Sequence, residues 1–222
     1  MNHSPLETAI LFYIGIVPIS RTIVTTWGLM VVLTVASWIV TRSFRVDAGG
    51  LQAMVESVVV GMEEQIAALL DRDAAPFLPL LGTLFIFLVA ANLCGIVPGV
   101  TAPTASIETP AALAAIVLLS SHFYGIRIQG LGAYLKHYLK PNPIMLPFNI
   151  LSELTRTFSL AMRLFGNIMS EEVVVAIILA LAGLLVPIPF MAFGILIGLV
   201  QAYIFSVLSA VFIGGGLGAI KT

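Results

Sequence analysis

Charged residues are scarce in this chain, and their scarcity decides the class of protein. Of 222 residues only 9% are Asp, Glu, Lys or Arg, whereas 59% are hydrophobic. An average soluble domain carries about 25% charged residues, so a water-facing surface of this size could not be built from so few. Lipid must therefore replace water around most of the molecule, and we expect an all-α integral membrane protein.

Other absences exclude whole classes of site. The net charge is −1 and there is no basic patch, so no nucleic-acid partner is expected. The single cysteine, Cys94, lies in an apolar run, which excludes a disulfide framework and a thiolate metal site. The chain lacks a nucleotide-binding loop and any Gly-x-Ser-x-Gly, His-Glu-x-x-His or paired-aspartate motif. We expect no cofactor, no metal ion and no catalytic site in this chain.

Apolar runs divide the chain into helices. A spanning helix needs about 20 mostly apolar residues, and on this measure residues 1–222 form a single membrane domain with five spans. The last two spans are expected to form a hairpin around Pro187-Ile188-Pro189. The predicted spans cover residues 22–40, 77–97, 110–124, 144–185 and 190–213.

The helix predicted over 144–185 is too long to cross a bilayer upright. No proline interrupts the chain between Pro147 and Pro187. A continuous helix of that length would measure nearly 60 Å, about twice the roughly 30 Å thickness of the hydrocarbon core. The helix must therefore tilt steeply or break.

Residues 51–71 show a different pattern, that of an amphipathic helix at the membrane surface. Apolar residues recur at helical spacing, while Glu56, Glu63, Glu64 and Asp71 cluster mostly on the other side. This polar face is acidic rather than rich in Lys and Arg. Contact with a neighbouring protein therefore explains it better than attraction to lipid does.

Basic residues indicate the orientation. The arrangement with the N-terminus outside and the C-terminus in the cytoplasm satisfies the positive-inside rule. We find no internal repeat, which disfavours inverted-repeat transporters. The basic residues then placed inside are Arg42, Arg45, Arg72, Arg127, Lys136, Lys140 and Lys221.

Arg163, near the middle of the longest apolar helix, is the first functional candidate. A charge deep in a bilayer is costly, so it needs a partner or a water-filled cavity. An arginine keeps its proton at any working pH, which makes it a poor proton relay and a good fixed electrostatic barrier. A buried structural ion pair is the alternative interpretation.

A polar stripe accompanies Arg163. At about 100° per residue, Glu171 and Glu153 border this stripe, whereas Glu172 falls near 200° and faces away from Arg163. An ion path ending at Glu172 would therefore be separated from the stripe by the helix itself. Alternative roles are packing for the serines, snorkelling for Arg156 and an interfacial charge for Glu171. Within an arc of about 80° lie Ser152, Arg156, Ser159, Arg163, Asn167 and Ser170.

The last helix offers one amide, Gln201. Gly194, Gly198, Gln201 and Phe205 share one helical face, and the Gly-x-x-x-Gly spacing permits close approach of a neighbouring backbone. The pattern predicts that Gln201 packs against the polar stripe around Arg163.

Three motifs carry a family resemblance. Residues 159–167 read Ser-Leu-Ala-Met-Arg-Leu-Phe-Gly-Asn, and with Glu172 they resemble the signature of subunit a of F-type ATP synthases. Residues 201–205, Gln-Ala-Tyr-Ile-Phe, resemble the second signature of that family. Residues 92–99 resemble the end of an earlier span, and the similarity covers most of the chain from about residue 76.

The resemblance implies an ion-translocating stator subunit in a bacterial plasma (inner) membrane. Its partners would be membrane lipid, peripheral-stalk b subunits and a rotor ring of c subunits, against which the last two helices pack. Arg163 would face the ring, Asn167 and Gln201 would line the polar path, and Glu172 would belong to the outer half-channel. Protons are favoured as the translocated ion and sodium is the alternative, while ATP chemistry would belong to a partner.

Some positions depart from the family pattern. Many members carry a histidine in the last helix that partners the glutamate, whereas Gly194 stands there in this chain. Glu171 beside Glu172 resembles the acidic pair of plastid members, and Glu108 stands in the outer loop where an amide is expected. His122 and His137 are isolated and are interpreted as interfacial. A stand-alone secondary transporter or channel is the alternative function, and a membrane-embedded enzyme is a weaker one.

Overall fold

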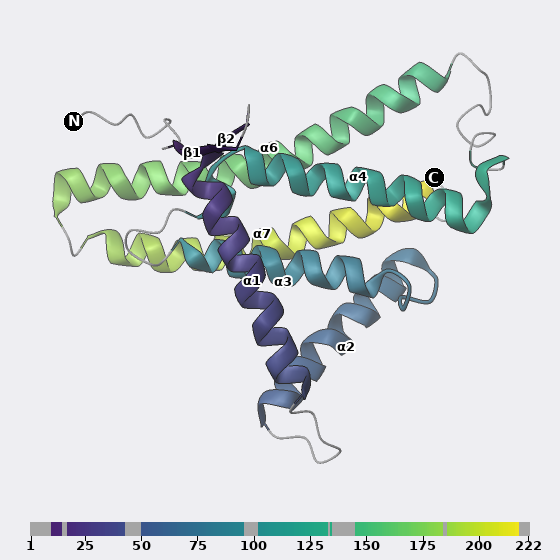
Figure 1. Cartoon of the computed structure of the whole chain (residues 1–222), viewed down its shortest axis with the longest axis horizontal. Helices are drawn as coiled ribbons and strands as arrows, with labels where there is room; N and C mark the ends of the chain where they lie inside the picture. Colours follow the sequence, from purple (N-terminus) through teal and green to yellow (C-terminus); the bar gives the residue numbers. More distant parts are fainter. Residues whose placement is uncertain are drawn as a thin grey trace.

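The computed structural model describes residues 10–14, 17–42, 50–95, 102–132, 134, 145–183 and 186–217 (Figure 1). Predictions for Arg45, Lys136, Lys140, Lys221, His137 and residues 96–99 lie outside these ranges. The elements are β1 (Ile10–Ile14), β2 (Val17–Ser20), α1 (Arg21–Arg42), α2 (Gly50–Leu70), α3 (Leu78–Cys94), the 3-10 helix η1 (Pro103–Ala105), α4 (Glu108–Gln129), α6 (Met145–Ala182) and α7 (Pro187–Gly216).

Four of the described helices, α1, α4, α6 and α7, are long and apolar enough to cross a membrane. Helix α3 is apolar but has only 17 residues. At 1.5 Å per residue it measures about 25 Å, slightly less than the roughly 30 Å of a hydrocarbon core. The helical membrane class predicted from composition therefore agrees with the fold, with α3 as a shorter apolar helix.

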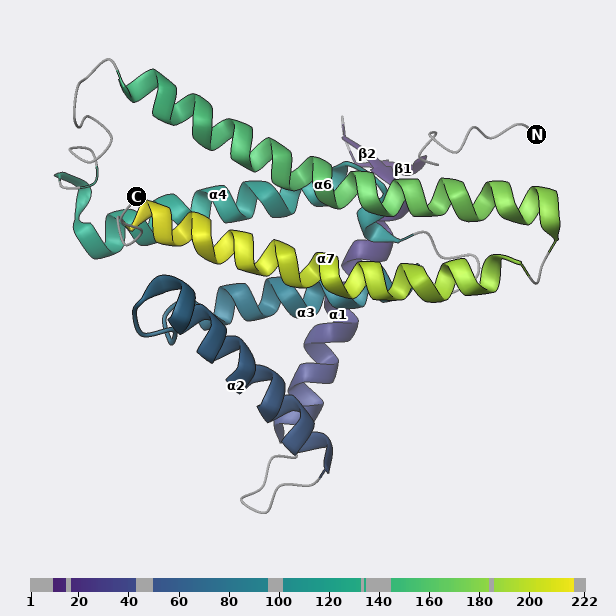
Figure 2. The ribbon, with the colours of Figure 1, turned by 180° about the vertical axis from the view of Figure 1, so that it is seen from behind.

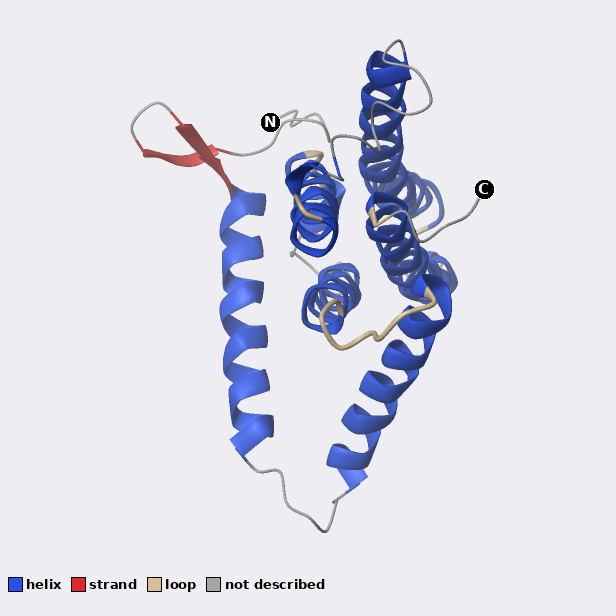
Figure 3. Ribbon diagram, turned by 90° about the vertical axis from the view of Figure 1, so that its right-hand side faces the viewer, coloured by secondary structure: helices blue, strands red, loops and turns tan. Residues whose placement is uncertain are grey.

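Helices α3, α4, α6 and α7 run side by side as a bundle, and α1 crosses them steeply. Figure 1 shows this crossing, and Figure 3, turned by 90°, shows the bundle helices end-on beside an upright α1. Helix α2 meets the bundle at one end, where it contacts α3 and α7. Because α1 and the bundle differ so much in direction, they cannot both stand upright in one bilayer.

Helix α7 lies at the centre of the packing and contacts α2, α3, α4 and α6. One core cluster joins α3, α4, α6 and α7 and includes the fully buried Leu88, Leu164 and Phe205. A second cluster joins the end of α2 to α3 and α7 around Leu70 and Ile213. The glycines and small residues of α7 allow neighbours to approach from several directions.

Helix α6 is continuous over 38 residues, about 57 Å, and runs antiparallel to α7 (Figure 2). Its first part diverges from α7 and the rest lies beside it. The predicted hairpin is present, but its turn comes just before Pro187-Ile188-Pro189 instead of at these residues. Gly183 has φ +78° just after α6, and α7 already begins at Pro187. Proline is tolerated in a first helical turn because the N–H groups there have no intrahelical partner.

The β1–β2 hairpin before α1 was not predicted. Its strands pair antiparallel, with Ile14 opposite Val17 and Ile10 opposite Ser20. The segment lacks alternating polarity and has no Asn-Gly or Asp-Gly turn, which are the usual sequence signals of a hairpin.

Candidate ion-translocation site

Arg163 lies on the exposed face of α6. Within the described residues its guanidinium has no hydrogen bond or ion pair. An adjacent face of the helix is in the core, where Leu160 and Leu164 are 2% and 0% exposed. Ser159, Asn167 and Ser170 are exposed as well, so the predicted polar stripe faces away from the core of the subunit.

Asn167 and Gln201 join α6 to α7. The Asn167 Nδ2 donates to Gln201 Oε1 at 2.7 Å, so Gln201 packs against the stripe as the glycine spacing predicts. Gln201 is only 3% exposed, and its Nε2 finds no acceptor among the described residues. A buried amide donor without an acceptor is costly, so this group needs an acceptor such as water.

Two positions of α7 require glycine because side chains of neighbouring helices lie very close to them. The carboxyl of Glu171 occupies the place where a Cβ on Gly194 would stand. A Cβ on Gly198 would lie 2.9 Å from the Cβ of Asn92 on α3. A side chain at either position would push a neighbouring helix or side chain away, so the two glycines set how closely α7 approaches α6 and α3.

The two adjacent glutamates share a cavity of about 260 Å³ between α3, η1, α6 and α7. The backbone N–H of Ala102 donates to the carboxyl of Glu172. Arg163 does not line this cavity, which agrees with the prediction that Glu172 faces away from it. A space that holds two carboxyls and an amide can take up a cation or water. The lining residues are Asn92, Gly95, Ala102, Ile168, Glu171, Glu172, Val175, Ala176, Leu179, Met191, Gly194 and Ile195.

Asn92 also lines this cavity, and the sequence alone did not indicate its role. Its Nδ2 donates to the carbonyl of Gly198 at 2.8 Å, and its Oδ1 accepts from Thr104 Oγ1 at 2.9 Å. The side chain thus ties α3 to α7 and to η1. An amide in the otherwise apolar α3 was the available signal, because such a group needs polar partners in lipid.

Glu108 lies apart from the two glutamates. It is in the first turn of α4, where a negative charge is favourable. Its Oε2 accepts from Ser20 Oγ at 2.8 Å, and Thr26 and Thr109 approach each other at 3.3 Å between their hydroxyls. Glu108 therefore joins the end of β2, just before α1, to α4 and does not line the cavity of Glu171 and Glu172.

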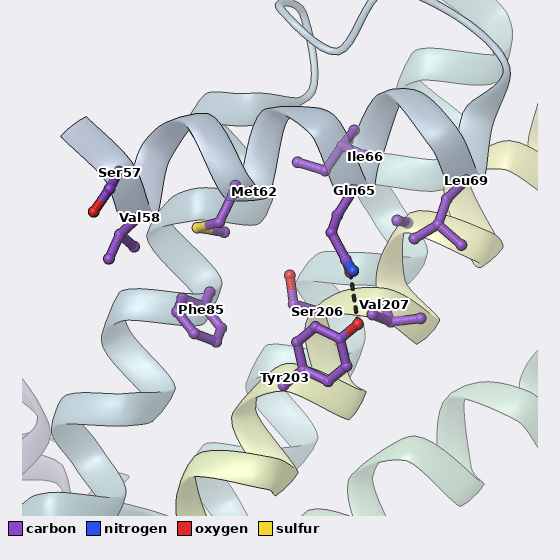
Figure 4. A pocket seen from close by; sticks show the side chains of 12 residues that line it. Ser57, Val58, Met62, Gln65, Ile66, Leu69, Phe85, Tyr203, Ser206 and Val207 are labelled. Atoms are coloured by element: carbon purple, nitrogen blue, oxygen red, sulfur yellow. Dashed lines mark hydrogen bonds between the residues drawn. The ribbon is translucent and has the colours of Figure 1, made fainter. Parts of the chain in front are cut away.

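A second cavity, of about 350 Å³, lies between α2, α3 and α7 (Figure 4). Its polar groups include Gln65 and Tyr203, which bond to each other through Tyr203 OH and Gln65 Oε1 at 2.7 Å. None of the residues that line it is charged. This cavity therefore offers no carboxylate or other charged group, in contrast to the cavity of Glu171 and Glu172.

Comparison with known proteins identifies the family. The family described as ATP synthase A chain matches residues 23–214. This chain belongs to the ATP synthase A chain family. ATP synthase subunit a 2 of Bradyrhizobium sp. (strain BTAi1 / ATCC BAA-1182) is 56% identical over 220 residues, 99% of each chain. ATP synthase subunit a 1 of Hahella chejuensis (strain KCTC 2396) is 49% identical over 212 residues, 96% of this chain and 90% of the relative.

Membership of the ATP synthase A chain family places the chain in a process that couples ion transport to ATP synthesis. Subunit a is an ion-translocating stator, and its partners are the c ring and the b subunits. Such a subunit is embedded in a membrane, as the apolar helices require.

Proposed function

We propose that residues 1–222 form one membrane domain that provides two offset aqueous half-channels beside a rotor ring. The cavity of Glu171 and Glu172 belongs to the outer half-channel, and the exposed stripe around Arg163 faces the ring. The N-terminus lies outside and the C-terminus in the cytoplasm of a bacterial plasma (inner) membrane, following the positive-inside rule. The α6–α7 hairpin lies steeply tilted against the ring, and its divergence in direction from α1 supports that tilt.

Arg163 drives ion release in this mechanism. A rotor carboxylate that carries its ion is neutral and can face lipid, whereas the bare carboxylate cannot, because a naked charge there is too costly. Close to Arg163 the positive charge favours the ionised carboxylate, so the ion leaves into one half-channel. The rotor must reload from the other half-channel before it moves on, and the ion gradient thereby sets the direction of rotation.

The remaining site residues shape the path. Asn167 and Gln201 line it beside Arg163, and their hydrogen bond holds the amides in place. Ser159 and Ser170 extend the polar surface toward either end of α6. Glu108 contributes to the outer mouth. Arg163 itself prevents a direct leak between the half-channels, because its fixed charge repels cations.

One observation carries this proposal: Arg163 is exposed on an apolar helix and finds no counter-ion among the described residues. A structural ion pair within the subunit, the competing interpretation, gains no support there. A partner that supplies carboxylates meets the need of this cation. Because the chain belongs to the ATP synthase A chain family, such a ring is favoured over a stand-alone transporter or channel.

The test is substitution of Arg163 in the assembled synthase reconstituted into vesicles. Arg163→Ala should abolish ATP synthesis driven by an ion gradient, because the rotor carboxylate is no longer discharged. Arg42→Ala, which removes an exposed cation at the end of α1 and outside the stripe, is the matched control and should retain most of the synthesis. Synthesis at normal yield by Arg163→Ala would refute the role.

The translocated ion is tested separately. We propose protons, with sodium as the alternative, since ion selectivity resides mainly in the rotor. ATP-driven acidification of vesicles that persists without sodium would support protons. Transport that stops when sodium is removed would assign sodium instead.

A further inference from the structure

A third carboxylate on α6, Glu153, has a partner on α4. The His122 Nδ1 lies 3.5 Å from Glu153 Oε1, and the two side chains are 40% and 23% exposed. The same Nδ1 lies 2.9 Å from the carbonyl of Leu118. In the tautomer with its hydrogen on Nδ1, that hydrogen can serve either acceptor and Nε2 is the nitrogen that can accept a proton.

Glu153 lies on the same face of α6 as Glu171. The two glutamates are about five helical turns apart, roughly 27 Å, and therefore point to the same face of the helix. Arg163 lies between them along the axis, about 15 Å from Glu153 and about 12 Å from Glu171. The fold covers the two ends differently: η1, α3 and α7 surround Glu171, whereas α4 supplies the partner of Glu153.

Packing alone does not explain two ionisable side chains in contact at this place. The contact between α4 and α6 is already held by apolar residues, among them Leu113, Val117 and Leu160. A pair of ionisable groups between apolar helices is often no better for stability than apolar side chains of similar volume. Ionisable residues within membrane helices are, by default, candidates for a role in ion movement.

The surroundings allow the pair to exchange a proton. The charged groups near it in sequence are Arg127 on α4 and Arg156 on α6, both exposed, and α7 carries no charged residue. The ring of Tyr134 lies 6.0 Å from that of His122, centroid to centroid, in an edge contact. An imidazole has two ring nitrogens, so it can accept a proton on one and give up a proton from the other.

We propose that His122 and Glu153 form the proton-transfer pair of the second half-channel, on the side of Arg163 away from Glu171 and Glu172. The inference rests on the proposed function. A proton released from a rotor carboxyl passes through water to the pair, which then gives one proton to the aqueous side. The pair gains and loses one proton in each passage, so no other reactant is consumed.

The experiment compares two kinds of substitution in the reconstituted complex. Glu153→Gln and His122→Gln should each lower ATP-driven proton pumping by about tenfold or more. A positioned acid or base typically contributes more than this to the rate of proton transfer. Glu153→Asp, which keeps a carboxylate, should retain more pumping than Glu153→Gln. Thr155→Val, which removes a hydroxyl bonded to the Leu151 carbonyl of its own helix in the same region of α6, is the matched control and should pump normally.

A double variant separates a proton relay from a structural contact. In His122→Leu with Glu153→Leu the pair is replaced by apolar side chains, and we expect normal assembly with strongly reduced pumping. The pH dependence of passive proton conduction, measured after the catalytic part is removed, should also change in His122→Gln. Normal pumping and an unchanged pH profile in the double variant would overturn the inference.

The outcome for Arg163 keeps the two proposals distinguishable. If Arg163→Ala is inactive while the His122 and Glu153 variants pump normally, only the proton-transfer pair is refuted. If Arg163→Ala also synthesises ATP normally, the proposed function itself fails.

Discussion

The two helices of the terminal hairpin, α6 and α7, are both long and apolar, but they differ in which of their faces are exposed and which are buried. On α7 the face with Gly194, Gly198, Gln201 and Phe205 is buried against other helices. On α6 the polar stripe with Arg163 is exposed, and only its apolar face is in the core. The chain thus uses α7 as the scaffold around which the bundle packs, and α6 as the surface on which ion chemistry takes place.

This difference predicts how tolerant each helix is to substitution. Changes on the buried face of α7 should reduce the stability of the subunit, whereas changes on the stripe of α6 should reduce ion transport and leave stability intact. The amount of subunit a in membranes and the melting temperature of the purified complex measure the first property. Vesicle transport assays measure the second.

The largest effect on stability is expected at Gly198. The added methyl in Gly198→Ala would lie 2.9 Å from the Asn92 Cβ, so α3 and α7 must separate. Overpacking of this kind costs about 1–3 kcal/mol, and the melting temperature should fall clearly. Gly166→Ala on α6 is the matched control, because no atom lies within 4 Å of its added Cβ. An equal loss in both variants would contradict the division between the two helices.

Asn92→Ala should have the next largest effect. The substitution removes a donor to the Gly198 carbonyl and an acceptor for Thr104, both in a partly buried setting. Leaving the Thr104 hydroxyl without its acceptor should cost about 1–3 kcal/mol. The measurement is the melting temperature of the complex, and Thr104→Val should lose less because it leaves only Asn92 without one partner. A stability equal to the unsubstituted protein would show that these bonds do not hold α3 to α7.

Tyr203→Phe should have a smaller effect. Tyr203 is 47% exposed, and its hydroxyl bonds to Gln65 on α2 at 2.7 Å. Loss of this single hydrogen bond should cost about 0.5 kcal/mol, at the low end of what one intramolecular bond contributes. Gln65→Leu should show a similar small change, and the double variant should lose no more than either single one. A large loss of stability would mean that α2 belongs to the group of helices that α7 holds together.

Gln201→Leu should cost no stability, although the residue is on the buried face of α7. The Nε2 of Gln201 has no acceptor among the described residues, and its partner Asn167 is exposed and can turn to water. Replacing an unsatisfied buried amide by an apolar side chain of similar size is nearly neutral. Ion transport should nevertheless fall, because the polar path loses a member. A strong loss of melting temperature would mean that Gln201 is structural.

Helical periodicity predicted which residues share a face of one helix, and it did so well. The stripe around Arg163 and the contact of Gln201 with Asn167 followed from spacing alone. Spacing says nothing about which neighbouring helix covers a face. For that reason the bonds of Asn92 and the contact of Glu171 with Gly194 emerge only from the fold.

The interpretation of His122 shows the same limit. Taken along the chain it is isolated, because Glu153 comes much later and on another helix. Antiparallel packing of α4 on α6 brings the two within 3.5 Å. The turn upstream of Pro187 was missed for a local reason: proline was interpreted as a turn residue, although it also suits the first turn of a helix.

Three side chains bond to backbone carbonyls of α7: Asn92 to Gly198, Ser121 to Phe212 and Gln129 to Gly216, at 2.8, 3.0 and 3.1 Å. A carbonyl has two lone pairs, so each can accept such a bond without leaving the helix. The three points spread over about 27 Å of α7 and come from two different helices. Sliding α7 along its axis by one residue would break all of them together. A stator next to a turning ring must withstand drag. These bonds resist it by holding the central helix at one position along its axis.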